Sequence, residues 1–155
     1  MSNIRWDRID MVCSYIEAHR KDFHMGRWIA RATLGGSTSE PVADFLRTGI
    51  APRMECGMTA CFGGELIILF PDEAESLLSK LGAKDYLPSY RLMTVCCDLI
   101  GISEEVGNQL FYKTSWPEPY CNMQDVKGLL ALVERAQREG SFDFILPEEE
   151  NHNGN

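Results

Sequence analysis

Two cysteines near the middle of the chain are the residues best suited to carry out chemistry. Cys56 and Cys61 lie in a glycine-rich stretch, and an apolar run that ends at Phe70 follows it directly. A long apolar run without a polar face favours a buried helix, whose first turn would carry Cys56. Free backbone N–H groups at a helix N-terminus stabilise a thiolate, so Cys56 is the candidate nucleophile.

A thiol nucleophile needs a base, which is most often a histidine. His19 and His24 precede Cys56, whereas papain-like hydrolases place the histidine after the cysteine. Geometry rather than chain order decides whether such a pair forms. Two interpretations therefore stay open. In the first, the protein is a thiol-dependent enzyme with Cys56 as nucleophile and His19 or His24 as base. In the second, Cys56 is shielded and serves only as a small hydrophobic residue. The second is favoured, because no base is clearly supplied.

A metal site can be drawn from the same cysteines and histidines, but their spacing argues against it. The paired Cys-x-x-Cys spacing is absent, and a structural zinc needs four converging ligands. The glycines at positions 57, 63 and 64 lack the lysine of a Walker-type phosphate loop. We interpret them as points where another part of the backbone approaches the central helix. We expect neither a metal nor a cofactor.

Glu65 is the one charged residue inside the apolar run. A buried carboxylate without a partner is costly. We therefore expect Glu65 either at a gap that is open to solvent or paired with Arg27 or Arg31.

Three aromatic residues are candidate anchors for a partner: Trp28, Tyr112 and Trp116. Such aromatic side chains serve either as core residues or as anchors for a partner. Trp116 is followed by a proline and is expected in an extended turn, where it could border a groove.

These motifs resemble, in their order, a family of small bacterial and phage proteins without an established activity. That family has a core of the form C-G-T-x-A-C-I-A-G, an upstream H-P-x-x-F-D-M-x-x-W and a downstream L-F-x-x-x-W-P. The matching residues are His19, Phe23, Met25, Trp28, Cys56, Gly57, Thr59, Ala60, Cys61, Gly64, Leu110, Phe111, Trp116 and Pro117. The chain departs from the pattern at Arg20, His24, Met58, Phe62 and Gly63. The resemblance implies that these positions form one unit, and it implies no particular reaction.

The elements that would position these residues are helices. Apolar residues recur at helical spacing from about Trp6 to His19 and in several later segments. Local signals mark helix starts at Pro71 and Ser103 and helix ends at Gly82, Gly101 and Gly140. We predict a mainly α fold, a compact bundle of five or six helices around a buried central helix from about Ala60 to Phe70. We find no convincing pair of strands, and the stretch from Thr33 to Pro52 is expected to be a long connection.

Length and composition place the chain among ordinary globular proteins. Its 155 residues suit one domain. We expect a helical domain over residues 1–146 and a disordered acidic tail over residues 147–155. No segment reaches the roughly 18 apolar residues that span a bilayer, and the N-terminus has no apolar signal segment. We expect a cytoplasmic protein with six reduced cysteines.

The charge distribution bears on the class of partner. The net charge is −8, and residues 54–155 hold seven basic residues against seventeen acidic ones. Sequence-independent binding to nucleic acid is therefore disfavoured. We expect a non-enzymatic binding or regulatory protein of phage or mobile-element origin, with another protein as its partner. A homo-oligomer is an open alternative.

Overall fold

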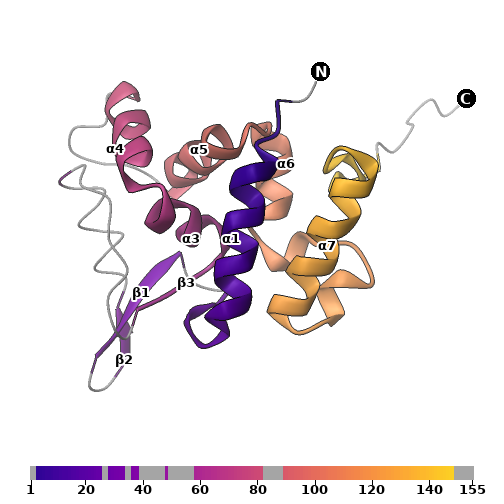
Figure 1. Ribbon diagram of the computed structural model, residues 1–155, viewed down its shortest axis with the longest axis horizontal. Coiled ribbons are helices and arrows are strands. Elements are labelled where there is room, and N and C mark those ends of the chain that lie inside the picture. Colours follow the sequence, from indigo (N-terminus) through magenta and orange to yellow (C-terminus); the bar gives the residue numbers. More distant parts are fainter. Residues whose placement is uncertain are drawn as a thin grey trace, which may run out of the picture.

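Helices dominate the part of the chain that the structure describes. The computed structural model describes residues 3–25, 28–33, 36–38, 48, 58–81 and 89–148. Within these ranges six α-helices are seen (Figure 1): α1 (Trp6–Ala18), α3 (Phe62–Leu69), α4 (Pro71–Lys80), α5 (Ser89–Ile100), α6 (Glu104–Leu110) and α7 (Asp125–Glu139). The predicted mainly α fold is confirmed.

The central helix α3 is the most deeply buried element. The side chains of Phe62, Leu66 and Ile67 are fully inaccessible to solvent. The helices α1, α4 and α5 surround it. An apolar run without a polar face can exclude water only when neighbours cover it on all sides, which is the arrangement observed. The buried helix predicted from about Ala60 to Phe70 is therefore confirmed.

The start of α3 differs from the sequence interpretation. Residues Met58–Ala60 form a strand, β3, and Cys61 is the N-cap of the helix. The helix thus begins at Phe62, six residues after Cys56, which precedes the strand in sequence. The prediction that the first helical turn carries Cys56 is wrong, because backbone pairing in a sheet occupies the residues between them.

A small antiparallel sheet lies beside the helices. Its strand order is β2-β1-β3, where β1 is Ile29–Thr33 and β2 is Gly36–Thr38. Ile29 of β1 is paired with Ala60 of β3, and Arg31 is paired with Met58. No pair of strands was expected from the sequence. Strands this short show little alternation of polar and apolar residues, and the pairing of β1 with β3 joins segments that are distant in sequence.

Local signals set most of the helix ends where they were predicted, and the predicted end at Gly82 lies outside the described residues. Pro71 is the first residue of α4, and the Ser103 hydroxyl caps α6 by accepting a hydrogen bond from the Val106 N–H at 3.2 Å. Gly140 ends α7 with a φ of 79°, a left-handed conformation that side chains with a Cβ rarely adopt. These ends depend on neighbouring residues alone, which explains why the sequence predicts them.

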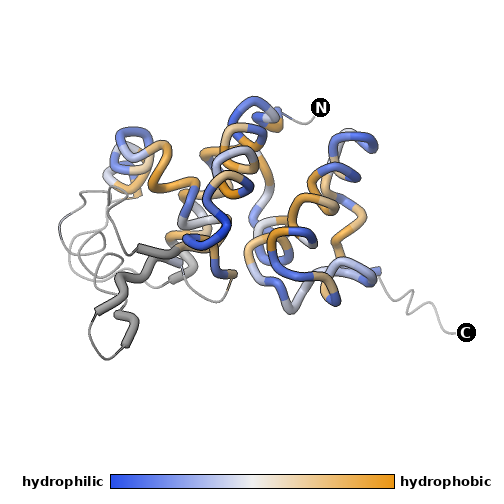
Figure 2. The backbone as a smooth tube through the Cα atoms, turned by 60° about the horizontal axis from the view of Figure 1, so that its bottom comes forward, coloured by the Kyte–Doolittle hydropathy of each residue, from blue (hydrophilic) through white to orange (hydrophobic). Residues whose placement is uncertain are grey.

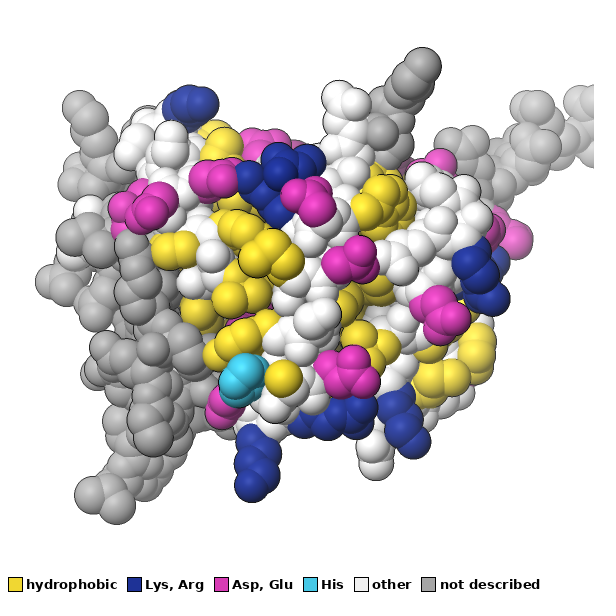
Figure 3. Space-filling view, in the orientation of Figure 1, with side chains coloured by type: hydrophobic (Ala, Val, Ile, Leu, Met, Phe, Trp, Pro, Cys, Tyr) yellow, Lys and Arg dark blue, Asp and Glu magenta, His cyan; other side chains and the backbone are white. Residues whose placement is uncertain are grey.

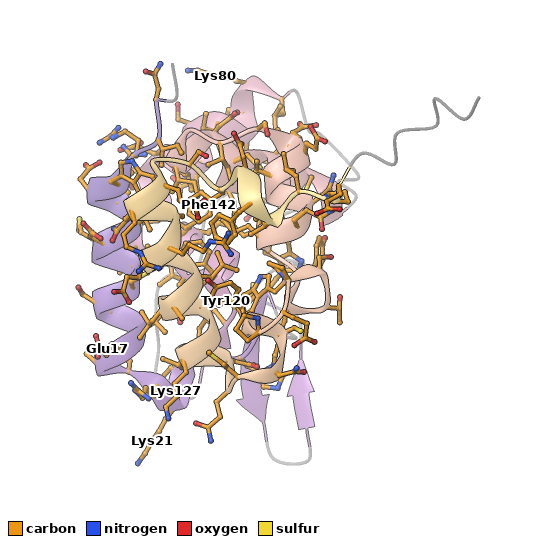
Figure 4. All side chains as sticks on the ribbon, turned by 90° about the vertical axis from the view of Figure 1, so that its right-hand side faces the viewer. Glu17, Lys21, Lys80, Tyr120, Lys127 and Phe142 are labelled. Carbon is orange, nitrogen blue, oxygen red and sulfur yellow. The ribbon has the colours of Figure 1, made fainter. Side chains whose placement is uncertain are left out.

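The helices α1 and α7 pack side by side across the core. Both helices carry hydrophobic and hydrophilic residues in alternation along their length (Figure 2), and the buried ones include Val12 and Ile16 of α1 and Leu129 and Leu132 of α7. Figure 4 shows Tyr120 and Phe142 on the segments that precede and follow α7, and both side chains are buried. The ring of Phe142 stacks on Trp6 of α1 with centroids 5.5 Å apart.

A buried arginine on α1 ties three helices together. The Arg8 Nη1 atom donates a hydrogen bond to the Leu99 carbonyl oxygen at 2.8 Å, and its Nη2 atom pairs with the Glu73 carboxylate. Its guanidinium also lies over the ring of Phe70, 5.0 Å from the centroid. Sequence reasoning missed this residue, because a single arginine between apolar positions carries no local signal of its partners.

Some predicted features lie outside the described residues. These are Cys56, residues 149–155 of the predicted tail and most of the connection from Thr33 to Pro52. No described helix has both the length and the apolar character needed to cross a membrane.

Candidate functional site

A cavity of about 400 Å³ lies where three segments of the chain meet. These segments are the turn after the short helix η1 (Arg20–Asp22), the N-terminus of α3, and the region around the short helix η2 (Lys113–Ser115). The lining residues are His24, Met25, Trp28, Cys61, Phe111, Tyr112, Lys113, Thr114 and Asp125. We refer to this space as the aromatic cavity. Its volume falls in the range of small ligand-binding pockets.

Two glycines of α3 hold Trp28 in place at the wall of this cavity. A Cβ atom on Gly64 would lie 1.6 Å from the Trp28 carbonyl oxygen, and a Cβ on Gly63 would lie 2.3 Å from the indole ring. The Cys61 N–H also donates a hydrogen bond to the same carbonyl oxygen at 3.4 Å. Only glycine permits so close an approach. The predicted approach of another part of the backbone is observed at Gly64, whereas at Gly63 the neighbour is a side chain, the Trp28 indole ring.

Three aromatic rings form an angled corner inside the cavity. The rings of Trp28 and Tyr112 are nearly perpendicular, at 87°, with centroids 6.3 Å apart. Phe111 is buried behind them, 6.0 Å from Trp28, and it packs in turn on Phe62 of α3 at 5.9 Å. Tyr112 is 38% exposed, and Trp28 is partly buried. The corner thus offers apolar surface to solvent while a rigid core supports it.

An ion pair forms the polar edge of the aromatic cavity. The Lys113 ammonium group pairs with Asp125 Oδ1, and Asp125 Oδ2 accepts a long hydrogen bond of 3.4 Å from the Met25 N–H. Asp125 therefore joins the turn after η1, the region of η2 and the first turn of α7. Because both charged side chains are about one-third exposed, they can reach polar groups of a molecule in the cavity.

Cys61 occupies the helix-terminal position that was predicted for Cys56. Its Sγ atom accepts a hydrogen bond from the Gly64 N–H at 3.4 Å. Burial nevertheless raises the pKa of Cys61 to about 12. Removal from water destabilises the thiolate more than the backbone N–H groups of Gly63 and Gly64 stabilise it. At neutral pH Cys61 is therefore held as the neutral thiol.

The structure separates the two candidate histidines. His24 lines the aromatic cavity, and its backbone N–H donates to the Ala60 carbonyl oxygen at 2.9 Å. His19 lines a different cavity, of about 360 Å³, formed by residues 17–22. There its Nδ1 atom donates to the Tyr15 carbonyl oxygen at 2.9 Å, and its ring stacks on Tyr15. Cys56, with which either histidine would form a catalytic pair, lies outside the described residues.

Trp116 is a core residue in this structure. It is only 3% exposed, and its indole N–H donates to the Leu110 carbonyl oxygen at 2.9 Å. Gly128 of α7 leaves room for its ring. The expectation that Trp116 borders a groove is therefore wrong, since tertiary packing against α7 covers it. Trp28 and Tyr112, the other two aromatic candidates, come together at the aromatic cavity.

Glu65 is a site residue whose environment the sequence did not reveal. It is 1% exposed, so the predicted gap open to solvent is absent at this position. Its Oε2 atom has no hydrogen-bond partner among the described residues. Burial first, and then the nearby carboxylate of Asp22, raise the pKa of Glu65 to about 8. The side chains of Arg27 and Arg31, its predicted partners, lie outside the described part.

The cysteines that the structure describes are all free thiols: Cys13, Cys61, Cys96, Cys97 and Cys121. Among the described residues, no group of three or more His, Cys, Asp or Glu side chains is arranged to hold a metal ion.

A second apolar surface lies over α1 and its neighbours. Figure 3 shows hydrophobic side chains gathered on this face, with charged side chains around them. Met11 of α1 is 55% exposed, and it does not line the aromatic cavity. Met11 therefore offers an internal comparison for experiments on Tyr112.

Comparison with known proteins adds no relative to this description. No protein-family model matches the chain, and neither a curated protein nor a solved structure is significantly similar to it.

Proposed function

We propose that this chain is a non-enzymatic binding protein that receives an apolar side chain of a protein partner in the aromatic cavity. The exposed face of Tyr112, set nearly perpendicular to Trp28, is the observation that carries the proposal. Aromatic residues at such a corner are typical anchors of protein interfaces. The ion pair of Lys113 and Asp125 supplies polar groups for the partner's backbone.

Rigidity of the corner supports the same function. Gly63 and Gly64 hold Trp28 against α3, and Phe111 packs between the corner and the core. A preformed pocket loses little conformational freedom when a partner binds, which leaves more of the contact energy for affinity. The five free thiols that the structure describes support the proposal that the protein acts in the reducing cytoplasm. Its relation to the small bacterial and phage proteins stays a prediction from the motifs.

A peptide-display selection on the purified protein tests the proposal. Linear peptides that are enriched on the wild-type protein are synthesised, and their dissociation constants are measured by fluorescence polarisation. We expect Tyr112→Ala to weaken binding at least tenfold, because anchor residues contribute about 2 kcal/mol or more. Met11→Ala removes an exposed apolar side chain of α1 that lies outside the aromatic cavity, and it should leave the affinity unchanged.

Two results would contradict the proposal. The first is a selection that enriches no peptide above an unrelated protein of similar charge. The second is a set of peptides that bind the Tyr112→Ala and wild-type proteins equally. Loss of binding in Met11→Ala alone would place the interface on the α1 surface.

A further inference from the structure

A buried carboxyl group lies on α3, the helix whose N-cap residue, Cys61, lines the aromatic cavity. Glu65 is in the first turns of α3, next to Gly64, where the backbone of Trp28 makes its closest approach. Its Oε2 atom is completely buried and has no hydrogen-bond partner among the described residues. The partial positive charge at a helix N-terminus favours an anion only modestly, whereas burial of an unpaired carboxylate is costly. The folded structure is therefore suited to the protonated form.

The titratable groups around Glu65 reinforce this preference. Asp22 of η1 is close enough for its charge to act on Glu65, and both carboxylates act on Tyr15 of α1. Cys61 precedes Glu65 on the same segment, and Cys96 of α5 donates to the Gly63 carbonyl oxygen at 3.2 Å. Both thiols are buried and neutral at neutral pH, because burial raises the pKa of each.

No described side chain around α3 supplies a compensating cation, and the side chains of Arg27 and Arg31 lie outside the described part. Arg8 of α1 is directed to the Leu99 carbonyl oxygen and to Glu73 of α4. Burial and Asp22 alone act on the pKa of Glu65 within the described part of the chain. An ionised Glu65 would thus be repelled by the Asp22 carboxylate, and no described cation would offset this repulsion.

The turn that carries Asp22 also builds the cavity. Phe23 forms a parallel bridge with Ala60, and the His24 N–H donates to the Ala60 carbonyl oxygen. Met25, the next residue, lines the cavity and donates its N–H to Asp125. A movement of η1 away from α3 would therefore displace a wall of the aromatic cavity.

We propose that Glu65 makes the aromatic cavity proton-sensitive: when its carboxyl group ionises, η1 moves away from α3 and Met25 moves with it. The movement lets water reach the carboxylate and increases its distance from Asp22. Local openings of this kind require less free energy than global unfolding. The proposal that this movement of η1 regulates partner binding rests on the function proposed above. The movement itself does not depend on that function.

Nuclear magnetic resonance of the free protein tests the movement without any partner. The chemical shifts of the Met25 backbone amide and of the Trp28 indole N–H are measured from pH 6 to pH 9.5. The measurement is made on the wild type, Glu65→Gln and Glu17→Gln. Glu17 is an exposed carboxylate that lines the neighbouring cavity beside η1, so its substitution is the matched control. In the wild type and in Glu17→Gln we expect the chemical shifts of both N–H signals to change with a midpoint near pH 8. In Glu65→Gln we expect this change to be absent.

The result separates this inference from the binding function. A step near pH 8 that persists in Glu65→Gln, or its absence from the wild type, would overturn the inference. Failure of the peptide selection, with the step present, would instead refute the binding function alone.

Discussion

Replacing Glu65 by glutamine should stabilise the protein, by an amount that increases with pH. Glutamine has nearly the same shape as glutamic acid and never ionises. In the unfolded chain the Glu65 carboxyl group has its ordinary pKa of 4.5, and in the folded protein burial and Asp22 raise it to about 8. Between these two values the unfolded state releases a proton that the folded state keeps. Wild-type stability therefore falls as pH rises through this window and levels off above about pH 8.

The size of the effect follows from this difference in pKa. Each unit of difference is worth about 1.4 kcal/mol. Linkage gives a loss of roughly 4 kcal/mol from the wild-type free energy of unfolding between pH 5 and pH 9. This is a large fraction of the 5–15 kcal/mol that is typical of a folded domain. Glu65→Gln does not undergo this loss, because glutamine does not ionise. The difference between the free energies of unfolding of the two proteins should therefore grow by that amount.

Urea denaturation followed by tryptophan fluorescence at pH 5, 6, 7, 8 and 9 measures this difference. Titrating groups that do not interact with Glu65 contribute equally to the two proteins, so their contributions cancel when the curves are subtracted. Glu105→Gln, which removes an exposed carboxylate from α6, is the control and should show a flat difference. A flat difference for Glu65→Gln as well would refute the reasoning. A variant less stable than the wild type at neutral pH would show that Glu65 is ionised and paired.

Two further predictions concern the buried arginine and the cysteines. Arg8→Ala should lower the free energy of unfolding by about 2–3 kcal/mol in urea denaturation, because the Leu99 carbonyl oxygen loses its donor. Arg5→Ala, which breaks only an exposed pair with Asp7, should leave stability unchanged, and equal effects of both variants would refute this account of Arg8. Six thiols should be counted after denaturation without reductant, and Cys56 should react slowly with iodoacetamide in the native protein. Rapid, selective alkylation of Cys56 that depends on His19 or His24 would instead favour the thiol-dependent enzyme.

The candidate site could be predicted only in part. Trp28 and Tyr112 were named from their residue type, and the structure brings them together with His24. Trp116 has the same residue type, yet packing against α7 buries it. Residue type shows that an aromatic side chain can bind a partner, but its exposure depends on elements that are distant in sequence.

Electrostatic environments were the least predictable feature. A helix N-terminus was expected to lower the pKa of a cysteine, and at Cys61 burial reverses the direction. Glu65 was expected to reach solvent or a cation, and it lies in a buried position beside Asp22. Such shifts depend on how much water the neighbouring elements exclude, which spacing along one segment does not reveal.

The sequence by itself determined the features that depend on neighbouring residues. Proline at position 71, serine at 103 and glycine at 140 mark helix ends through their own backbone preferences and short-range hydrogen bonds. The apolar run before Phe70 determined which helix is central, because no face of it can meet water. Tertiary structure alone decided the pairing of β1 with β3, the helix start at Cys61 and the meeting of Trp28 with Tyr112. Each of these depends on contacts between segments that are distant in sequence. The free energy of such contacts cannot be inferred from any one segment alone.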